Sequence, residues 1–151
     1  MFRFWAGCRS SQNPLKSYCQ TFDFTSFAKG FLMDIVQLGK VEPFITKDGS
    51  EIRELLSHRN SSIRLQSLAE ARVPSGTTTQ LHFHVRTEEI YYITHGQGKV
   101  RLEDQWCEVK PGDAIAIPPG TRHQITADTA CDLCFLCCCS PAYEHEDTVL
   151  L

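Results

Sequence analysis

Short hydrophobic runs separated by turn residues fill the chain from about residue 60 to its end. The runs are rich in Val, Ile, Tyr and Thr, and Gly, Pro and Asp stand between them. Runs this short and closely spaced predict a sandwich or small barrel and argue against alternating strands and helices. The predicted strands are 63–73, 80–86, 88–94, 99–103, 106–109, 114–117, 122–127 and 131–139. The pattern therefore indicates an all-β domain over residues 60–151.

The segment 33–59 is less regular, and we interpret it as an N-terminal arm of this domain. After a turn-forming Asp-Gly-Ser, residues 51–58 place Ile52, Leu55 and Leu56 on one face of a helix. The arm is therefore predicted to contain a short helix, with an edge strand as the alternative.

Residues 1–32 carry a charge of +3, whereas the rest of the chain carries −6. No apolar stretch precedes a small-residue cleavage site, which argues against a secretory signal. Three interpretations stay open: a dispensable extension with Met33 as the natural start, a basic organelle presequence, or an ordered arm that covers a sheet edge. We expect a chain beginning at Met33 to fold.

The composition is that of a globular protein, with 151 residues, 42% hydrophobic and 22% charged. No apolar run approaches the roughly 18 residues of a membrane span. A net charge of −3 gives no basic surface for nucleic acid. Five of the eight cysteines lie in 131–139, where neighbouring thiols are poorly placed to bridge each other. Free thiols there indicate a reducing compartment, so we expect a cytoplasmic protein without membrane or nucleic-acid partners.

Two histidines and a glutamate share a spacing that suits a metal. The first motif is Gly76-x5-His82-x-His84-x4-Glu89-x6-Gly96. Residues two apart on a strand point to the same face, so His82 and His84 present their imidazoles together. Glu89 has the parity of Tyr91 and Ile93 on the next strand, and it faces inward if they do. Two imidazoles and one carboxylate suit a first-row transition metal.

A second motif supplies a third imidazole. It reads Gly112-x5-Pro118-x-Gly120-x2-His123, with Gly-Pro turns on both sides of the strand 114–117. The second turn sends the chain back, so that His123 can join the other ligands. Three His and one Glu leave positions open on an octahedral ion, which is typical of a catalytic or ligand-binding site.

Both motifs resemble the two signature motifs of the cupins, which are jelly-roll barrels built as a double-stranded β-helix. One departure is Ala127, where the family often has an asparagine at a packing position. The resemblance covers roughly residues 60–140. It implies that His82, His84, Glu89 and His123 bind one divalent metal, such as Fe(II), Mn(II), Ni(II) or Zn(II). It also implies a homodimer.

Three further residues are candidates for contact with a substrate. Tyr91 shares the inward parity of Glu89, so it either packs in the core or donates a proton near the metal. Arg64 and Gln66 precede the first motif on a predicted strand and could point into the barrel mouth to hold an anion. His58, His95 and His145 have no partner pattern and are expected to be exposed.

The cysteine-rich segment 131–139 is predicted to be a packed strand. Strand alternation separates Cys131, Cys134 and Cys137, which argues against a metal cluster. Leu133, Phe135, Cys137 and Cys139 are predicted to line one face, and Cys134, Leu136 and Cys138 the other. Because both faces are apolar, a second cover is expected, either a partner subunit or the N-terminal arm.

One fold hosts many chemistries, so the resemblance leaves the reaction open. The first interpretation is a mononuclear non-haem metal oxidoreductase, dioxygenase-like, acting on a small oxygenated metabolite. A metal-dependent isomerase, epimerase or lyase of a sugar or small acid is the alternative. A second alternative is a cupin that binds a small ligand without converting it.

Overall fold

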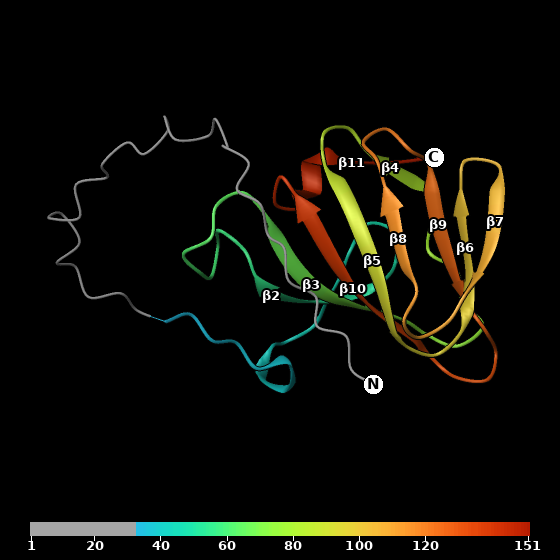
Figure 1. Cartoon of the computed structure of the whole chain (residues 1–151), viewed down its shortest axis with the longest axis horizontal. Helices are drawn as coiled ribbons and strands as arrows, with labels where there is room; N and C mark the ends of the chain where they lie inside the picture. The colour runs from blue at the N-terminus through green and yellow to red at the C-terminus, as the bar shows by residue number, and fades with distance from the viewer. Residues whose placement is uncertain (1–32) are drawn as a thin grey trace, which may run out of the picture. The chain divides into compact units, whose positions relative to one another are not determined.

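The computed structural model describes residues 33–151, which form two antiparallel sheets facing each other (Figure 1). In sheet order, the first contains β1 (Phe44–Ile45), β2 (Glu51–Leu56), β3 (Ser67–Val73), β10 (Leu133–Ser140), β5 (Glu88–His95) and β8 (Ala114–Ile117). The second contains β11 (Thr148–Leu150), β4 (His82–His84), β9 (His123–Ala127), β6 (Gly98–Leu102) and β7 (Gln105–Val109). Two short 3-10 helices are η2 (Leu38–Lys40) and η3 (His145–Asp147). The interpretations of residues 1–32 lie outside the described residues.

The all-β prediction is confirmed, and each of the eight predicted runs contains a strand. Two glycines, one in the turn after β5 and one at the start of β6, let neighbouring backbone approach closely. A Cβ on Gly96, which has a φ of 80°, would collide with the carbonyl oxygen of Asp132. A Cβ on Gly98 would collide with the carbonyl oxygen of Thr126 on β9. These contacts allow β6 to lie against β9 while β5 remains in the other sheet.

The predicted helix at 51–58 is wrong, because this segment forms β2. It pairs antiparallel with β3, from Glu51 opposite Arg72 to Leu56 opposite Leu68. Pairing with a neighbouring strand outweighs the weak helical pattern, since local propensity yields to tertiary contacts. Ile52 packs against the buried core. The arm thus supplies strands to the six-stranded sheet, with β1 at its edge.

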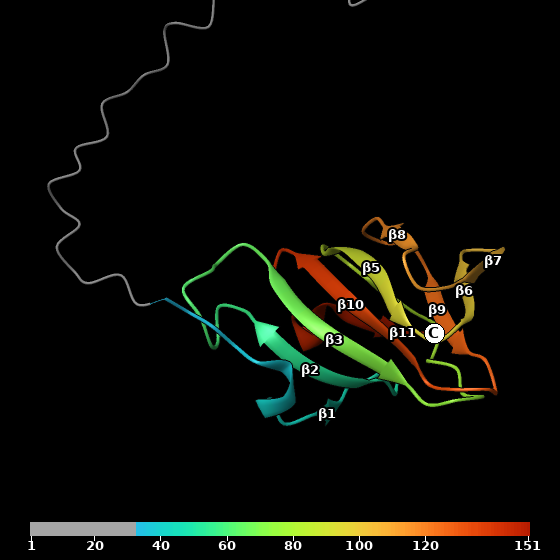
Figure 2. The same cartoon turned by 60° about the horizontal axis from the view of Figure 1, so that its bottom comes forward.

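The buried core residues come from strands of both sheets, which Figure 2 shows from a second direction. On β10 the predicted alternation is confirmed, because Leu133, Phe135, Cys137 and Cys139 are buried and the intervening side chains are half-buried. On the outer face of β5, Ile90 is 49% exposed. The outer face of this sheet therefore exposes apolar side-chain surface to solvent.

The cysteines in the described part of the chain are free thiols. No helix there is long and apolar enough to cross a membrane.

Candidate metal centre

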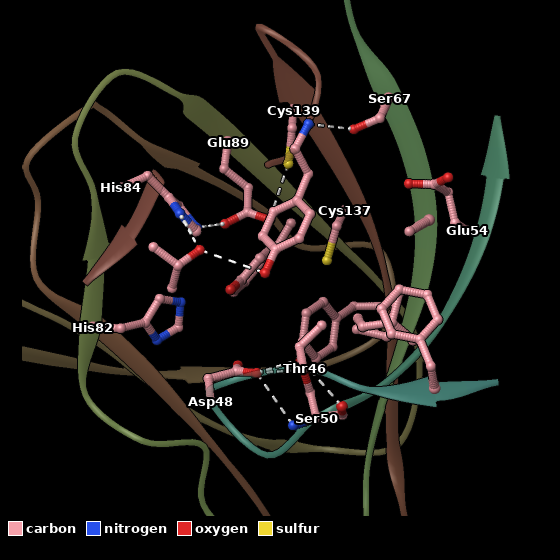
Figure 3. Close-up of a pocket in the computed structure, with 18 residues that line it drawn as sticks. Thr46, Asp48, Ser50, Glu54, Ser67, His82, His84, Glu89, Cys137 and Cys139 are labelled. Atoms are coloured by element: carbon pink, nitrogen blue, oxygen red, sulfur yellow. Dashed lines mark hydrogen bonds and ion pairs between the residues drawn. The ribbon is translucent and has the colours of Figure 1, made fainter. Parts of the chain in front are cut away.

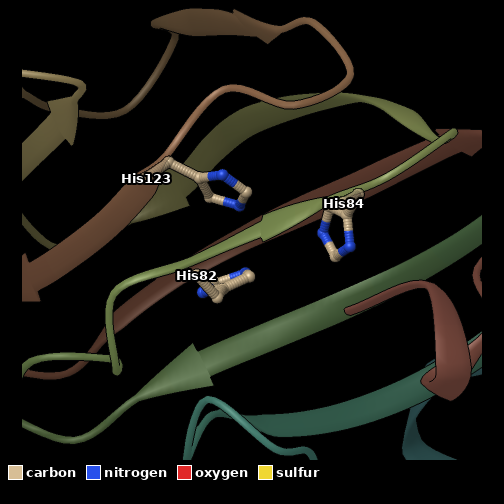
Figure 4. A group of neighbouring side chains, drawn as sticks. All are labelled: His82, His84 and His123. Atoms are coloured by element: carbon tan, nitrogen blue, oxygen red, sulfur yellow. The ribbon is translucent and has the colours of Figure 1, made fainter. Parts of the chain in front are cut away.

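Three imidazoles converge between the sheets (Figure 4). His82 and His84 project from the same face of β4, and His82 lies opposite His123 on β9. One nitrogen from each ring lies within 4.8 Å of the other two. The three residues are 3%, 4% and 0% exposed, respectively. Strand alternation and cross-strand pairing are therefore enough to bring the three rings together.

Glu89 reaches this group from the facing sheet. Its Oε2 lies 3.2 Å from Nε2 of His84 and 3.6 Å from Nε2 of His123. The side chain is buried, whereas Glu88 beside it is exposed, as the parity argument predicts. The structure thus brings together all four residues of the predicted ligand set.

Hydrogen bonds orient two of the rings through the protein backbone. Nδ1 of His82 lies 2.8 Å from the carbonyl oxygen of Gln80, and Nδ1 of His123 lies 2.9 Å from that of Thr121. A carbonyl oxygen only accepts, so we assign the hydrogen to Nδ1 in both rings. This tautomer leaves the lone pair of Nε2 free to bind a metal.

The third ring is oriented by a hydroxyl group. Thr148, at the start of β11, donates from Oγ1 to the phenol oxygen of Tyr143 at 3.4 Å. Its oxygen therefore remains to accept a hydrogen bond from Nδ1 of His84, 3.2 Å away. His84 thus also directs its Nε2 lone pair toward Glu89. Neither Tyr143 nor Thr148 lies in a recognisable motif, so the sequence did not predict their place at this site.

The residues fit a bound cation. Oε2 of Glu89 and Nε2 of His123 are buried atoms without a hydrogen-bond partner among the described residues. Both are acceptors, and burying unpaired acceptors against each other is costly. A divalent ion between them would satisfy both, and three imidazoles with one carboxylate suit first-row transition metals.

Two of these ligands hold their protons weakly. Burial lowers the pKa of His82, and the neighbouring His123 lowers it further. Burial alone would raise the pKa of Glu89, but His123 and His84, where they are protonated in the metal-free protein, hold that pKa below its ordinary value. Both groups are therefore ready to bind a metal at neutral pH.

Cys139 supports Glu89 from the side away from the histidines. Its Sγ lies 3.3 Å from Oε1 of Glu89. Burial and the Glu89 charge raise the pKa of this thiol, so it stays protonated and donates to Oε1. Oε2 is left facing the imidazoles. From the sequence, Cys139 was predicted only to pack on one face of its strand.

Tyr91 lines the same cavity, which has a volume of about 50 Å³. Figure 3 shows this cavity with His82, His84 and Glu89 among the labelled residues of its lining. The ring centroid of Tyr91 lies 6.0 Å from that of His123 and 4.5 Å from that of Phe135. Burial and the charge of Glu89 raise the pKa of Tyr91, so its phenol is protonated. The cavity is large enough for a few waters or a small ligand.

The structure does not place Arg64 and Gln66 in the barrel mouth. Both are exposed and precede β3, which begins only at Ser67, so strand alternation does not extend to them. Arg64 donates to the carbonyl oxygens of Ser61 and Ile63, both at 2.7 Å. His58, His95 and His145 are exposed, as predicted.

A family model described as "Cupin domain" matches residues 69–139, which contain the three histidines and Glu89. An uncharacterised protein of Methanocaldococcus jannaschii is 52% identical over 112 residues, covering 74% of this chain and 90% of the relative. The chain belongs to the cupin family.

Two further similar proteins, both from Thermotoga maritima, have names that describe a ligand or a reaction. An oxalate-binding protein is 31% identical over 86 residues, covering 57% of this chain and 71% of the relative. The crystal structure of a predicted oxalate decarboxylase has a TM-score of 0.62 and 28% identity, covering 71% of this chain and 98% of the other.

One wall of the cavity lies outside the segment that the cupin model matches. The arm contributes Phe44, Thr46, Asp48, Ser50, Ile52 and Glu54. These residues lie on β1, on β2 and in the turn between them. Turn residues were recognised in this region of the sequence, but no spacing connected them with the metal ligands.

Proposed function

We propose that this cupin binds one divalent transition metal through His82, His84, Glu89 and His123, and oxidises a small oxygenated metabolite held in the cavity. One observation carries the proposal. Oε2 of Glu89 and Nε2 of His123 are buried hydrogen-bond acceptors without a partner among the described residues, and they lie within a group of four potential metal-ligand atoms. Fe(II), Mn(II), Ni(II) and Zn(II) all suit these ligands.

The protein's own groups would prepare the site for chemistry. A bound metal would act as a Lewis acid and, if redox-active, exchange electrons with a substrate at its open positions. Tyr91 offers a protonated phenol beside the histidines, suited to donating a hydrogen bond to a substrate oxygen. Cys139 and Thr148 hold Glu89 and His84 in position from behind.

Two alternatives have support from individual relatives. Binding without turnover is favoured by the 31% identity to the oxalate-binding protein. A lyase or isomerase reaction is favoured by the similarity to the predicted oxalate decarboxylase.

The test is metal analysis of protein purified without a histidine tag, followed by a substrate screen on the Fe(II)-loaded form. Oxygen uptake in proportion to substrate loss would support the oxidoreductase. Conversion under anaerobic conditions would instead support an isomerase or lyase. Saturable binding with neither result would support a binding protein.

A further inference from the structure

The cavity is rich in acidic groups and poor in basic ones. Its lining residues include Asp48, Glu54 and Glu89, but no Lys or Arg among the described residues. Glu89 faces the imidazoles, and Glu54 is paired with Arg59 and accepts a hydrogen bond from Ser57 at 2.7 Å. Asp48 is thus the carboxylate left without a cationic partner within the described part of the chain.

Asp48 lies in the turn between β1 and β2, near His82 in the cavity (Figure 3). Its Oδ1 accepts hydrogen bonds from Oγ1 of Thr46 at 2.6 Å, Oγ of Ser50 at 2.8 Å and the backbone N–H of Ser50 at 3.2 Å. The residue is only 9% exposed. For Oδ2 the structure gives no hydrogen bond to any described residue, so this oxygen remains available to a ligand.

The backbone ties Asp48 to one of the metal ligands. The N–H of Gln80 donates to the carbonyl oxygen of Asp48 at 2.7 Å, and the carbonyl oxygen of Gln80 accepts from Nδ1 of His82. Two consecutive hydrogen bonds therefore fix the turn that carries Asp48 relative to His82.

We propose that Asp48 makes this centre selective for uncharged substrates, an inference that rests on the proposed metal-binding function. A divalent ion carries two positive charges, which Glu89 and Asp48 together cancel. A dicarboxylate such as oxalate would then bring two uncompensated negative charges into a buried cavity without a Lys or Arg in its described lining. A small neutral molecule, such as a hydroxycarbonyl compound or a polyol, adds none and can donate to Oδ2 of Asp48.

Three probes of nearly one shape test this proposal. Oxalate, oxamate and oxamide carry two, one and no negative charges at neutral pH, and each has oxygen atoms to offer a metal. They would be titrated into the full-length Co(II)-loaded protein, with binding followed by the visible absorption of Co(II). The wild-type protein is expected to bind oxamide at least as tightly as oxalate. A clear preference for oxalate would overturn the proposal without any variant.

Asp48→Asn keeps an oxygen for the three donors, removes the charge and replaces Oδ2 by an NH2 group. We expect it to tighten oxalate binding about tenfold and oxamate binding about threefold. It should not tighten oxamide binding, because the amide N–H groups of oxamide lose Oδ2 as an acceptor. Asp104→Asn is the matched control, because the side chain of Asp104 is 86% exposed on a turn; it should change none of the three. Equal effects of Asp48→Asn on all three probes, or none, would overturn the inference. Failure to take up Co(II) would instead overturn the proposed function and this inference with it.

Discussion

The cavity has two walls that are built in different ways. The first wall holds the proposed metal ligands and takes them from regular strands: His82 and His84 from β4, His123 from β9 and Glu89 from β5. The wall formed by the arm takes Asp48 from a turn, where hydrogen bonds within the turn hold its side chain. Strand pairing fixes the positions of the four side chains around the metal, whereas the side chain of residue 48 can change while the backbone hydrogen bond from Gln80 to this turn stays in place. We infer that the first wall sets the chemistry and the second the choice of substrate.

Removing ligands from the first wall should have the largest effect. The double substitution His82→Ala and His123→Ala is expected to lower metal content from about one ion per chain to near zero, because it removes two of four ligands. Metal analysis after dialysis measures this. His95→Ala is the matched control, since His95 is exposed. Full metal occupancy in the double variant would show that the ion binds elsewhere.

Acid should also release the metal from the first wall, because protonated imidazoles cannot bind a metal. The pKa of His82 and that of Glu89 are both lowered, so these ligands stay deprotonated at lower pH than they would in water. Dialysis at a series of pH values should therefore show half-release of the metal below about pH 6.5, the ordinary pKa of histidine. Half-release above that value would contradict the account.

The two walls also differ in how far the sequence predicted them. The four ligands could be predicted because strand alternation places residues two apart on the same face. Asp48 and Tyr143 could not, since the first depends on hydrogen bonds within a turn and the second on where the chain runs after β10. The prediction of a helix at 51–58 was wrong for a related reason. This segment forms β2 because it pairs with β3, and that pairing is not apparent from the local sequence. The prediction that Arg64 and Gln66 point into the barrel mouth was wrong because β3 begins only after these residues.

A substitution in the C-terminal segment, which supports the first wall, is expected to have a smaller effect, on the free energy of unfolding. The carboxylate of Asp147, only 3% exposed, accepts from the backbone N–H groups of Arg86 and Thr87 at 3.2 and 3.0 Å. We expect Asp147→Asn to lower the free energy of unfolding by about 1–3 kcal/mol at pH 7. Urea denaturation measures this, with Asp104→Asn as the exposed control. Equal stability of the wild type and Asp147→Asn at pH 7 would refute this role.

The pH dependence of this difference follows from the pKa of Asp147. Burial alone would raise it, but hydrogen bonds from Thr87 and Arg86 lower it to about 2. A lowered pKa in the folded state stabilises the fold fully above the ordinary value near 3.8, and this contribution is lost as the pH falls toward 2. The gap between the wild type and Asp147→Asn should therefore be wide at pH 7 and narrow near pH 2. A gap that widens in acid would contradict this sign.

Substitutions on the outer face of β10 are expected to have the smallest effect on the metal content of the cavity. We propose that a second copy of the chain covers this face, where Cys134 and Cys138 are half-buried and Ile90 is exposed nearby on β5. Replacing Cys134 and Cys138 with Ser should weaken self-association in sedimentation experiments and leave about one metal per chain. Cys107→Ser, on β7, is the exposed control. A wild-type protein that sediments as a monomer would refute the proposed dimer.

X-ray absorption spectroscopy of the Zn(II)-loaded protein tests the metal centre most directly, because it distinguishes nitrogen and oxygen ligands from sulfur. The distinction matters here, since the Cys139 thiol lies beside Glu89. The account predicts a shell of nitrogen and oxygen atoms at about 2.0–2.2 Å, with the scattering pattern of three imidazoles. A sulfur ligand at about 2.3 Å, or fewer than three imidazoles, would contradict it.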